Sequence, residues 1–171
     1  LVRNPAKAEG LGIAVRKFDY EQPEALPEAL DGIDSLIFIS GSEMGKRVPQ
    51  HTNVINAAKS AGVKNIVYTS LLYADSTSLI LAPEHLTTEG LLKDSGIPHT
   101  ILRNGWYTEN YTANLKDAVK RGVIIGSAGN GKISSATRED YAQAIVEVIS
   151  NDDHTGKTYE LAGDDFYTME E

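Results

Sequence analysis

The chain has 171 residues, of which 41% are hydrophobic and 23% charged, a composition typical of one globular domain and not of a disordered chain. It contains no cysteine, which excludes disulfides and thiolate metal or redox sites within these residues. The formal net charge of -8 disfavours nucleic acid and anionic membrane as partners, and the longest apolar runs are too short to span a bilayer.

Both ends of the sequence read as interrupted elements. Leu1 and Val2 run directly into Arg3-Asn4-Pro5, which is typical of the end of a buried strand and its exit turn. At the other end, Thr168 and Glu171 have the spacing of a capping box that opens a helix. We therefore expect residues 1–171 to be one domain and an internal piece of a longer protein. The alternative is a complete small domain with frayed ends.

The first half of the chain alternates short apolar segments with helical ones. We expect a weak strand at 13–15, a helix from about Pro23 to Gly32, a strand at 35–39, a helix from Pro49 to Gly62, and a strand at 63–68. Residues 35–39 form a continuous apolar run, which is typical of a strand covered on both faces. The pattern predicts strand-helix-strand units.

The second half continues the alternation. We expect a helix over 83–95 closed by Gly96, strands at 97–102 and 123–125, a helix over 138–149, and a last strand at 158–161. Connections of helix length between successive strands indicate parallel pairing, because parallel neighbours need a covering crossover. The sequence therefore predicts an α/β fold with a doubly wound parallel sheet.

In such a sheet, ligands bind across the carboxyl ends of the strands. The residues that follow the predicted strands are small, polar or aromatic, which suits a nucleotide with a flat redox ring; they are Arg3-Asn4, Asp19-Tyr20, Ser40-Gly41-Ser42, Thr69-Ser70 and residues 103–107. Arg3 could meet the 2′-phosphate of NADP, with added charge from Lys7, whereas NAD sites use an acidic residue. The alternative for Arg3 is a solvated side chain beside a proline turn.

Residues 126–131 look like a phosphate-binding loop, but no apolar helix start follows them. A hairpin turn is the better interpretation. No Walker pattern, nucleophile elbow or His-x-x-x-His pair occurs in the sequence. His51, His99 and His154 lie apart and are interpreted as surface or structural residues.

Several segments together resemble the NmrA-like branch of the atypical short-chain dehydrogenase/reductases, above all its quinone-reducing bacterial members, with triphenylmethane dye reductases as a related group. The resemblance is carried by RNPAKA (3–8), NVINAAK (53–59), AGVK (61–64) and LRNGWY (102–107), and it extends through SSATR (134–138) and YELAG (159–163). It covers essentially the whole chain, and the LRNGWY segment is its most specific part.

The resemblance implies a Rossmann-like fold with NADP as cofactor. Family members begin with a strand and a Gly-x-x-Gly-x-x-Gly loop, and they carry a C-terminal lobe that helps form the substrate pocket; we expect both to lie outside this chain. By the same resemblance, Arg3 meets the 2′-phosphate side, Ile39, Ser40 and Gly41 lie along the cofactor, and the nicotinamide is framed by Asn104, Gly105, Trp106, Tyr107, Thr108 and Glu109.

The Tyr-x-x-x-Lys pair of typical short-chain reductases is absent, because Leu81 stands in the tyrosine position and His85 in the lysine position. Ketone reduction forms a basic alkoxide that needs a positioned acid, whereas quinone reduction forms a delocalised phenolate. His85 is our candidate catalytic residue, as a group that polarises the acceptor or anchors the ribose; an exposed helix histidine is the alternative. Tyr73 and Tyr107 are candidates for ring stacking or proton donation.

We therefore predict an NADPH-dependent oxidoreductase that transfers a hydride to a quinone or another flat aromatic acceptor. Reduction of triphenylmethane dyes is a variant of the same hypothesis. A non-catalytic NAD(P)-binding redox sensor is the alternative from another class, because it too would lack the catalytic pair. We expect a cytoplasmic protein with neither nucleic acid nor membrane as partner, and the sequence leaves homo-oligomer formation open.

Overall fold

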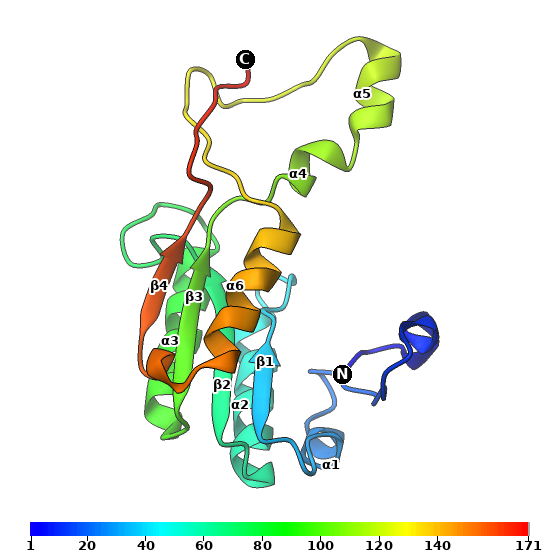
Figure 1. Ribbon diagram of the computed structural model, residues 1–171, viewed down its shortest axis with the longest axis vertical. Coiled ribbons are helices and arrows are strands. Elements are labelled where there is room, and N and C mark those ends of the chain that lie inside the picture. The colour runs from blue at the N-terminus through cyan, green and yellow to red at the C-terminus, as the bar shows by residue number, and fades with distance from the viewer. Residues whose placement is uncertain (171) are drawn as a thin grey trace.

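Four parallel strands form the central sheet of the computed structural model, which describes residues 1–170 (Figure 1). They are β1 (Ser35–Phe38), β2 (Asn65–Leu71), β3 (His99–Asn104) and β4 (Thr158–Leu161), and they lie side by side in chain order. The register pairs Ile37 with Val67, Tyr68 with Ile101, and Leu102 with Tyr159. All carboxyl ends of the strands therefore meet at one edge.

Helices cover both faces of this sheet. On one face lie α2 (Arg47–Ala61) and α3 (Ala82–Ser95), and on the other lies α6 (Arg138–Ser150) (Figure 1). The remaining helices are short: α1 (Leu26–Ala29), α4 (Glu109–Thr112), α5 (Leu115–Arg121), and the 3-10 turns Pro5–Lys7, Glu9–Leu11, Pro23–Ala25 and Asp152–His154. The predicted doubly wound α/β sheet is confirmed.

The strand β2 shows how the sequence builds two cores. Its residues alternate between the faces, so Ile66 and Tyr68 are buried with the residues of α2 and α3. Between them, Val67 points to the opposite face, where it packs with Leu102, Ile145 and Val148. The apolar run at 35–39 predicted the strand β1 correctly, but the expected cover on both faces is wrong: Leu36 and Phe38 are buried, whereas Ile37 and Ile39 are 42% and 53% exposed.

Local sequence signals account for the ends of the main helices. Thr137 and Asp140 form a reciprocal capping box that starts α6. Gly62 and Gly96 end α2 and α3 in the left-handed conformation, with φ of 75° and 76°. Among residues 1–170, no helix is long and apolar enough to cross a membrane.

Two predicted strands are wrong. Residues 13–15 and 123–125 form no strand, and Ile13 and Ile125 are 69% and 84% exposed. No neighbouring strand pairs with either segment; near the first, a single parallel bridge joins Val2 to Lys17. β-branched residues alone do not make a strand without a ladder partner, because an unpaired strand leaves its backbone groups to water.

Three other expectations need adjustment. The helix expected from Pro23 to Gly32 is reduced to one 3-10 turn and the four-residue α1. The glycine-rich segment at 126–131 contains a turn closed by Gly131 N–H on the Ala128 carbonyl, but no strands flank it as a hairpin. The capping box predicted at the C-terminus includes Glu171, which lies outside the described residues.

Candidate functional site: a trough across the strand ends

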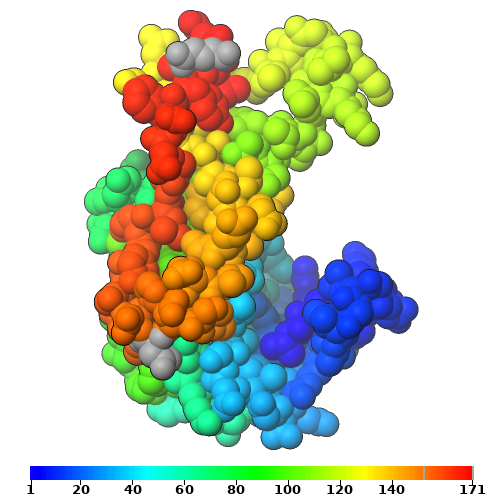
Figure 2. Space-filling model, in the orientation of Figure 1, coloured from blue at the N-terminus to red at the C-terminus, as the bar shows by residue number. Residues whose placement is uncertain are grey.

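The segment 39–42, directly after β1, lies between two adjoining hollows at the carboxyl edge of the sheet. One has a volume of about 310 Å³ and extends to Arg3 and Tyr20. The other, of about 590 Å³, extends to residues from β2, β3, α3 and α6. Because 39–42 line both, the two hollows adjoin along this segment, and we refer to them together as the trough; it lies on the side of the molecule that is open between the N-terminal segment and α5 (Figure 2).

Four side chains fix the backbone of this segment. The Tyr20 hydroxyl donates to the Ile39 carbonyl at 3.1 Å, and the Thr69 hydroxyl accepts from Ser40 N–H at 3.0 Å. His51 Nε2 accepts from Gly41 N–H at 2.9 Å, and Arg47 Nε donates to the Gly41 carbonyl at 2.8 Å. The backbone N–H and the backbone carbonyl of Gly41 are thus both bonded to buried side chains of α2.

The protonation state of His51 follows from these contacts. Its Nε2 accepts from Gly41, so the proton of the neutral ring lies on Nδ1, which donates to Thr88 Oγ1 at 2.9 Å. The ring is fully buried, and burial, followed by the charge of Arg47, lowers the pKa of His51 to about 3. His51 is therefore a neutral acceptor across the physiological pH range.

The far end of the trough is formed by Asn104 and the residues after it. Asn104 is buried and lines the larger hollow; its Nδ2 donates to the Tyr107 hydroxyl at 3.3 Å, while its Oδ1 is buried without a hydrogen-bond partner. Gly105 stands where a Cβ would meet Leu161 O and Tyr141 Oη, each at 3.1 Å. An unsatisfied buried acceptor beside a cleft calls for a donor from a ligand or water.

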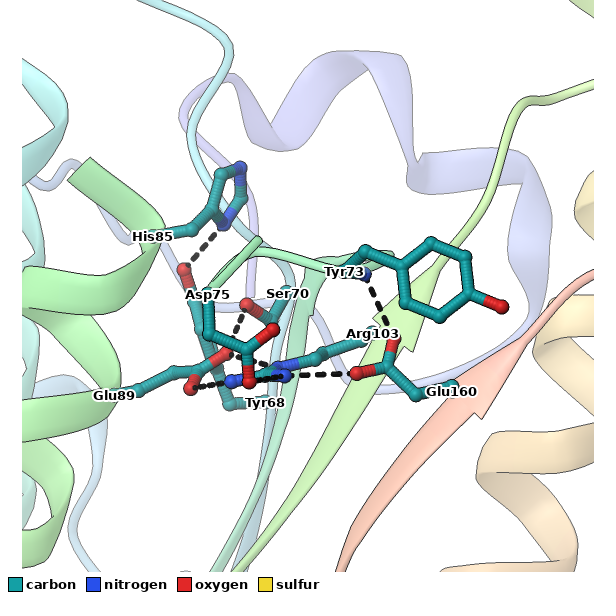
Figure 3. Close-up of polar contacts among 8 residues, drawn as sticks. All are labelled: Tyr68, Ser70, Tyr73, Asp75, His85, Glu89, Arg103 and Glu160. Atoms are coloured by element: carbon teal, nitrogen blue, oxygen red, sulfur yellow. Dashed lines mark hydrogen bonds and ion pairs between the residues drawn. The ribbon is translucent and has the colours of Figure 1, made fainter. Parts of the chain in front are cut away.

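His85 lines the larger hollow and is only 5% exposed, so the alternative of an exposed helix histidine is wrong. Its Nδ1 lies 2.9 Å from the Tyr68 hydroxyl, and the other ring nitrogen points away from that contact (Figure 3). Burial, followed by the charge of Arg47, lowers the pKa of His85 to about 4. The ring is therefore neutral at pH 7, so it can form a hydrogen bond but cannot act as a cationic acid.

Beneath the trough, Arg103 of β3 binds three carboxylates (Figure 3). Nε and Nη2 form a two-point contact with Glu89 of α3 at 2.9 and 2.8 Å, and Nη1 binds Asp75 at 2.8 Å and Glu160 at 2.7 Å. Glu89 also accepts from Ser70 Oγ at 2.6 Å. The cluster joins β2, β3, β4 and α3 at the strand ends, and its hydrogen bonds raise the pKa of Arg103.

The structure brings most of the predicted site residues to the trough. Arg3 lines the smaller hollow, where its side chain is 71% exposed and Nη1 lies 3.3 Å from Glu43. The larger hollow is lined by the predicted residues Ile39, Ser40, Gly41, His85, Asn104, Gly105, Trp106 and Tyr107. Lys7 lines neither hollow.

Thr108 and Glu109 are placed differently from the other predicted residues. The Thr108 hydroxyl bonds Ser135 Oγ at 2.9 Å, and the Glu109 carboxylate accepts from Arg138 N–H at 2.9 Å. Neither residue lines the trough. Both side chains bind the segment that leads into α6, so their evident role is to hold that helix against the site.

Sequence analysis did not identify Arg47, Glu84, Glu89 or the three-carboxylate contact of Arg103 as supports of the trough. The structural interpretation of His51 is confirmed, because its buried ring binds Gly41 and Thr88, but the pattern did not show what it contacts. One signal was available for Arg103, because a charged residue inside a strand that is covered on both faces must find a partner. For Arg47 and His51, the helical pattern of α2 gave no such signal.

Comparison with known proteins places these features in context. The pattern of the NAD(P)H-binding family matches residues 1–152. Quinone oxidoreductase 2 of Escherichia coli is 59% identical over 172 residues, which cover 99% of this chain and 60% of that protein. An NmrA-like family domain-containing oxidoreductase of Aspergillus flavus is 37% identical over 153 residues, covering 85% of this chain and 50% of that protein.

Solved structures of two reductases are also similar to this chain. The E. coli NADPH-dependent quinone oxidoreductase complexed with NADPH superposes with a TM-score of 0.90 at 60% identity, over 97% of this chain and 60% of that one. The Citrobacter triphenylmethane reductase complexed with NADP(H) gives a TM-score of 0.91 at 39% identity, with the same coverage. The chain thus spans about 60% of the length of these two reductases, and half of the fungal relative.

Proposed function

The chain belongs to the NAD(P)H-binding family, in its NmrA-like branch, and from that membership we propose that it forms the cofactor-binding part of an NADPH-dependent quinone reductase. The observation that carries the proposal is the trough across the strand ends, with Arg3 at one end and the carboxamide of Asn104 at the other.

The residues present fit NADPH. The side chain of Arg3 is 71% exposed and forms an ion pair with Glu43, so its guanidinium is accessible to the 2′-phosphate. The fixed backbone of 39–42 lines both hollows, and a Cβ at Gly41 would press on Gln50 Oε1 at 3.0 Å and His51 Nε2 at 3.5 Å, so glycine allows this backbone to lie close to α2. Asn104 lines the trough, and its Oδ1 has no donor among the described residues; rotation of the carboxamide would present this oxygen to the carboxamide N–H of the nicotinamide.

When bound, NADPH supplies a hydride to the acceptor. The protein's own task is then to hold the two flat rings together and to exclude other reactions, which proximity and orientation achieve. His85 is neutral at pH 7, so we assign it the role of a hydrogen-bond donor toward an acceptor oxygen, with Tyr68 holding its Nδ1. This weak donor suffices for a quinone, because the phenolate product is delocalised.

Leu81 also lines the larger hollow, in the position where typical short-chain reductases have a tyrosine acid. An aliphatic side chain cannot protonate an alkoxide, so the site is poorly equipped for ketone reduction. We therefore expect the protein to reduce quinones and not aliphatic ketones.

Steady-state oxidation of NADPH by the full-length protein tests this function, with a simple benzoquinone, a triarylmethane dye and an aliphatic ketone as alternative acceptors. We expect turnover of the quinone far above the uncatalysed rate and none of the ketone. Turnover of the ketone alone would contradict the proposal. NADPH binding without turnover of any acceptor would instead support a redox sensor.

A further inference from the structure

Tyr73 has a strained backbone conformation beside the trough. Its φ is 52°, and it is the only non-glycine residue with positive φ within residues 1–170. Such a conformation disfavours a residue with a Cβ and persists only where surrounding contacts impose it.

The Arg103 cluster holds it. Tyr73 N–H donates to Glu160 Oε2 at 2.8 Å, while the other oxygen of that carboxylate accepts from Arg103 at 2.7 Å. The Tyr73 carbonyl accepts from Ser76 N–H at 2.9 Å and from Thr77 N–H at 2.8 Å, and Asp75 binds Arg103 from the same turn. The Tyr73 N–H is thus bonded to Glu160 of β4, and its carbonyl closes a turn that Asp75 anchors to Arg103 of β3.

The consequence is that the Tyr73 ring points away from the cluster (Figure 3). The residue is 56% exposed and lines a third hollow of about 510 Å³, together with Leu72, Trp106 and Tyr111. Trp106 and Tyr111 have ring centroids 6.3 Å apart at an angle of 48°. Three aromatic side chains therefore surround one open space.

This aromatic hollow adjoins the cofactor trough, because Trp106 lines both. An acceptor ring placed at the Asn104 end of the trough would lie beside this hollow, whose walls include Leu72 and three aromatic side chains. Aromatic walls favour such a group, since stacked or edge-to-face ring pairs add to the effect of burial. Lys132 also lines the hollow and disfavours a cationic substituent there.

We infer that this aromatic hollow binds the outer ring of a fused-ring quinone, and that Tyr73 is a specificity-determining residue for such acceptors. The inference rests on the proposed quinone reductase function. Glu160 acts as a positioning residue, because it holds the Tyr73 backbone in the conformation that directs the ring into the hollow.

Tyr73→Gly is the most informative variant. Glycine adopts positive φ freely, so the turn keeps its shape while the ring is lost, and Tm is not reduced. The ratio of kcat/KM for 2-methyl-1,4-naphthoquinone to that for 1,4-benzoquinone should fall about fivefold, mainly through KM of the two-ring acceptor. Tyr73→Phe keeps the ring and should restore the ratio. Leu79→Ala, an exposed change in the same loop, is the control.

Glu160 provides the second comparison. Glu160→Ala removes the acceptor of Tyr73 N–H and should lower the same ratio, whereas Glu160→Gln keeps an oxygen at that position and should restore most of it. An unchanged ratio in Tyr73→Gly, or a Tyr73→Phe variant as impaired as the glycine variant, would overturn the inference. Turnover of benzoquinone by the wild-type protein tests the proposed function separately, so failure of one is distinguishable from failure of the other.

Discussion

His51 accepts a hydrogen bond from the backbone of Gly41 through Nε2, and its opposite nitrogen binds Thr88 on the neighbouring helix. A fully buried, neutral imidazole therefore fixes the peptide at the centre of the trough. The arrangement requires a group that accepts on one side and donates on the other, which only the neutral form of histidine provides at this place.

This buried pair of histidines predicts a pH-dependent stability. The pKa values of His51 and His85 are lowered to about 3 and about 4, below the 6.5 of the unfolded chain. Between pH 6.5 and 4 the unfolded state binds protons that the folded state does not, so the free energy of unfolding falls as pH falls. The two residues together contribute a slope of roughly 2–3 kcal/mol per pH unit.

Urea unfolding of the full-length protein between pH 7 and 4.5 measures this slope. His51→Gln and His85→Gln should each reduce it by about half. Repeating the series in 1 M NaCl is the control, because salt screens exposed charges and leaves the burial of the two rings unchanged. A slope that disappears in high salt would show that surface charges are responsible instead.

Gly105 and Gly90 form a matched pair of glycine positions. A Cβ at Gly105 would meet Leu161 O, Tyr141 Oη and Leu72 Cδ2 at 3.1–3.3 Å, whereas a Cβ at Gly90, inside α3, would meet nothing within 4 Å. Gly105→Ala should therefore destabilise the protein by about 1–3 kcal/mol and weaken NADPH binding. Gly90→Ala should stabilise it by about 0.5–1 kcal/mol without affecting the cofactor.

Thermal unfolding and NADPH titration of both variants check this pair. Similar effects of the two substitutions on cofactor affinity would mean that the close packing around Gly105 does not shape the site.

The Arg103–Glu89 contact predicts a large single-site effect. Both side chains are buried, so Glu89→Ala leaves a buried guanidinium without its two-point partner and should cost about 3–5 kcal/mol. Replacing both residues with methionine should recover much of this loss, because a buried ion pair is often no better than apolar packing. Chemical denaturation gives both values. A double variant as unstable as the single one would show that Asp75 and Glu160 also need the guanidinium.

Much of this architecture could be predicted from the sequence. The apolar runs of β1 and β2, the glycine ends of α2 and α3, and the exact span of β4 are local features, and the structure confirms them. The strands predicted at 13–15 and 123–125 failed because a strand depends on a neighbour that periodicity does not identify.

The sequence could likewise place some residues of the candidate site but not the contacts between them. Residues at or just after strand ends, such as Asn104 and Ser40, could be placed at the trough because topology brings all strand ends to one edge. The contacts of Gly41 with Arg47 and His51, and of Arg103 with Glu89 and Glu160, join positions that no local pattern relates. They arise from packing between elements, so only the structure reveals them.

Arg3 predicts a preference between cofactors. Arg3→Ala should weaken NADPH binding about tenfold and leave NADH binding nearly unchanged, since only NADPH carries the phosphate. Glu43→Gln should strengthen NADPH binding modestly, because Glu43 is the residue that now pairs with Arg3. Lys64→Ala, at an exposed ion pair with Asp34, is the control. Calorimetric titration with each cofactor measures these values, and equal losses for NADPH and NADH would refute the role of Arg3.

The central claim is that NADPH lies along the trough with its nicotinamide beside Trp106, the only tryptophan of these 171 residues. Energy transfer from this indole to the reduced nicotinamide measures the claim directly, as quenching of tryptophan emission during NADPH titration of the full-length protein. We predict saturable quenching of the emission that Trp106 contributes, measured as the difference between the wild-type protein and Trp106→Phe, while Trp106→Phe still binds NADPH. Saturable NADPH binding that leaves the emission of Trp106 unchanged would contradict the account.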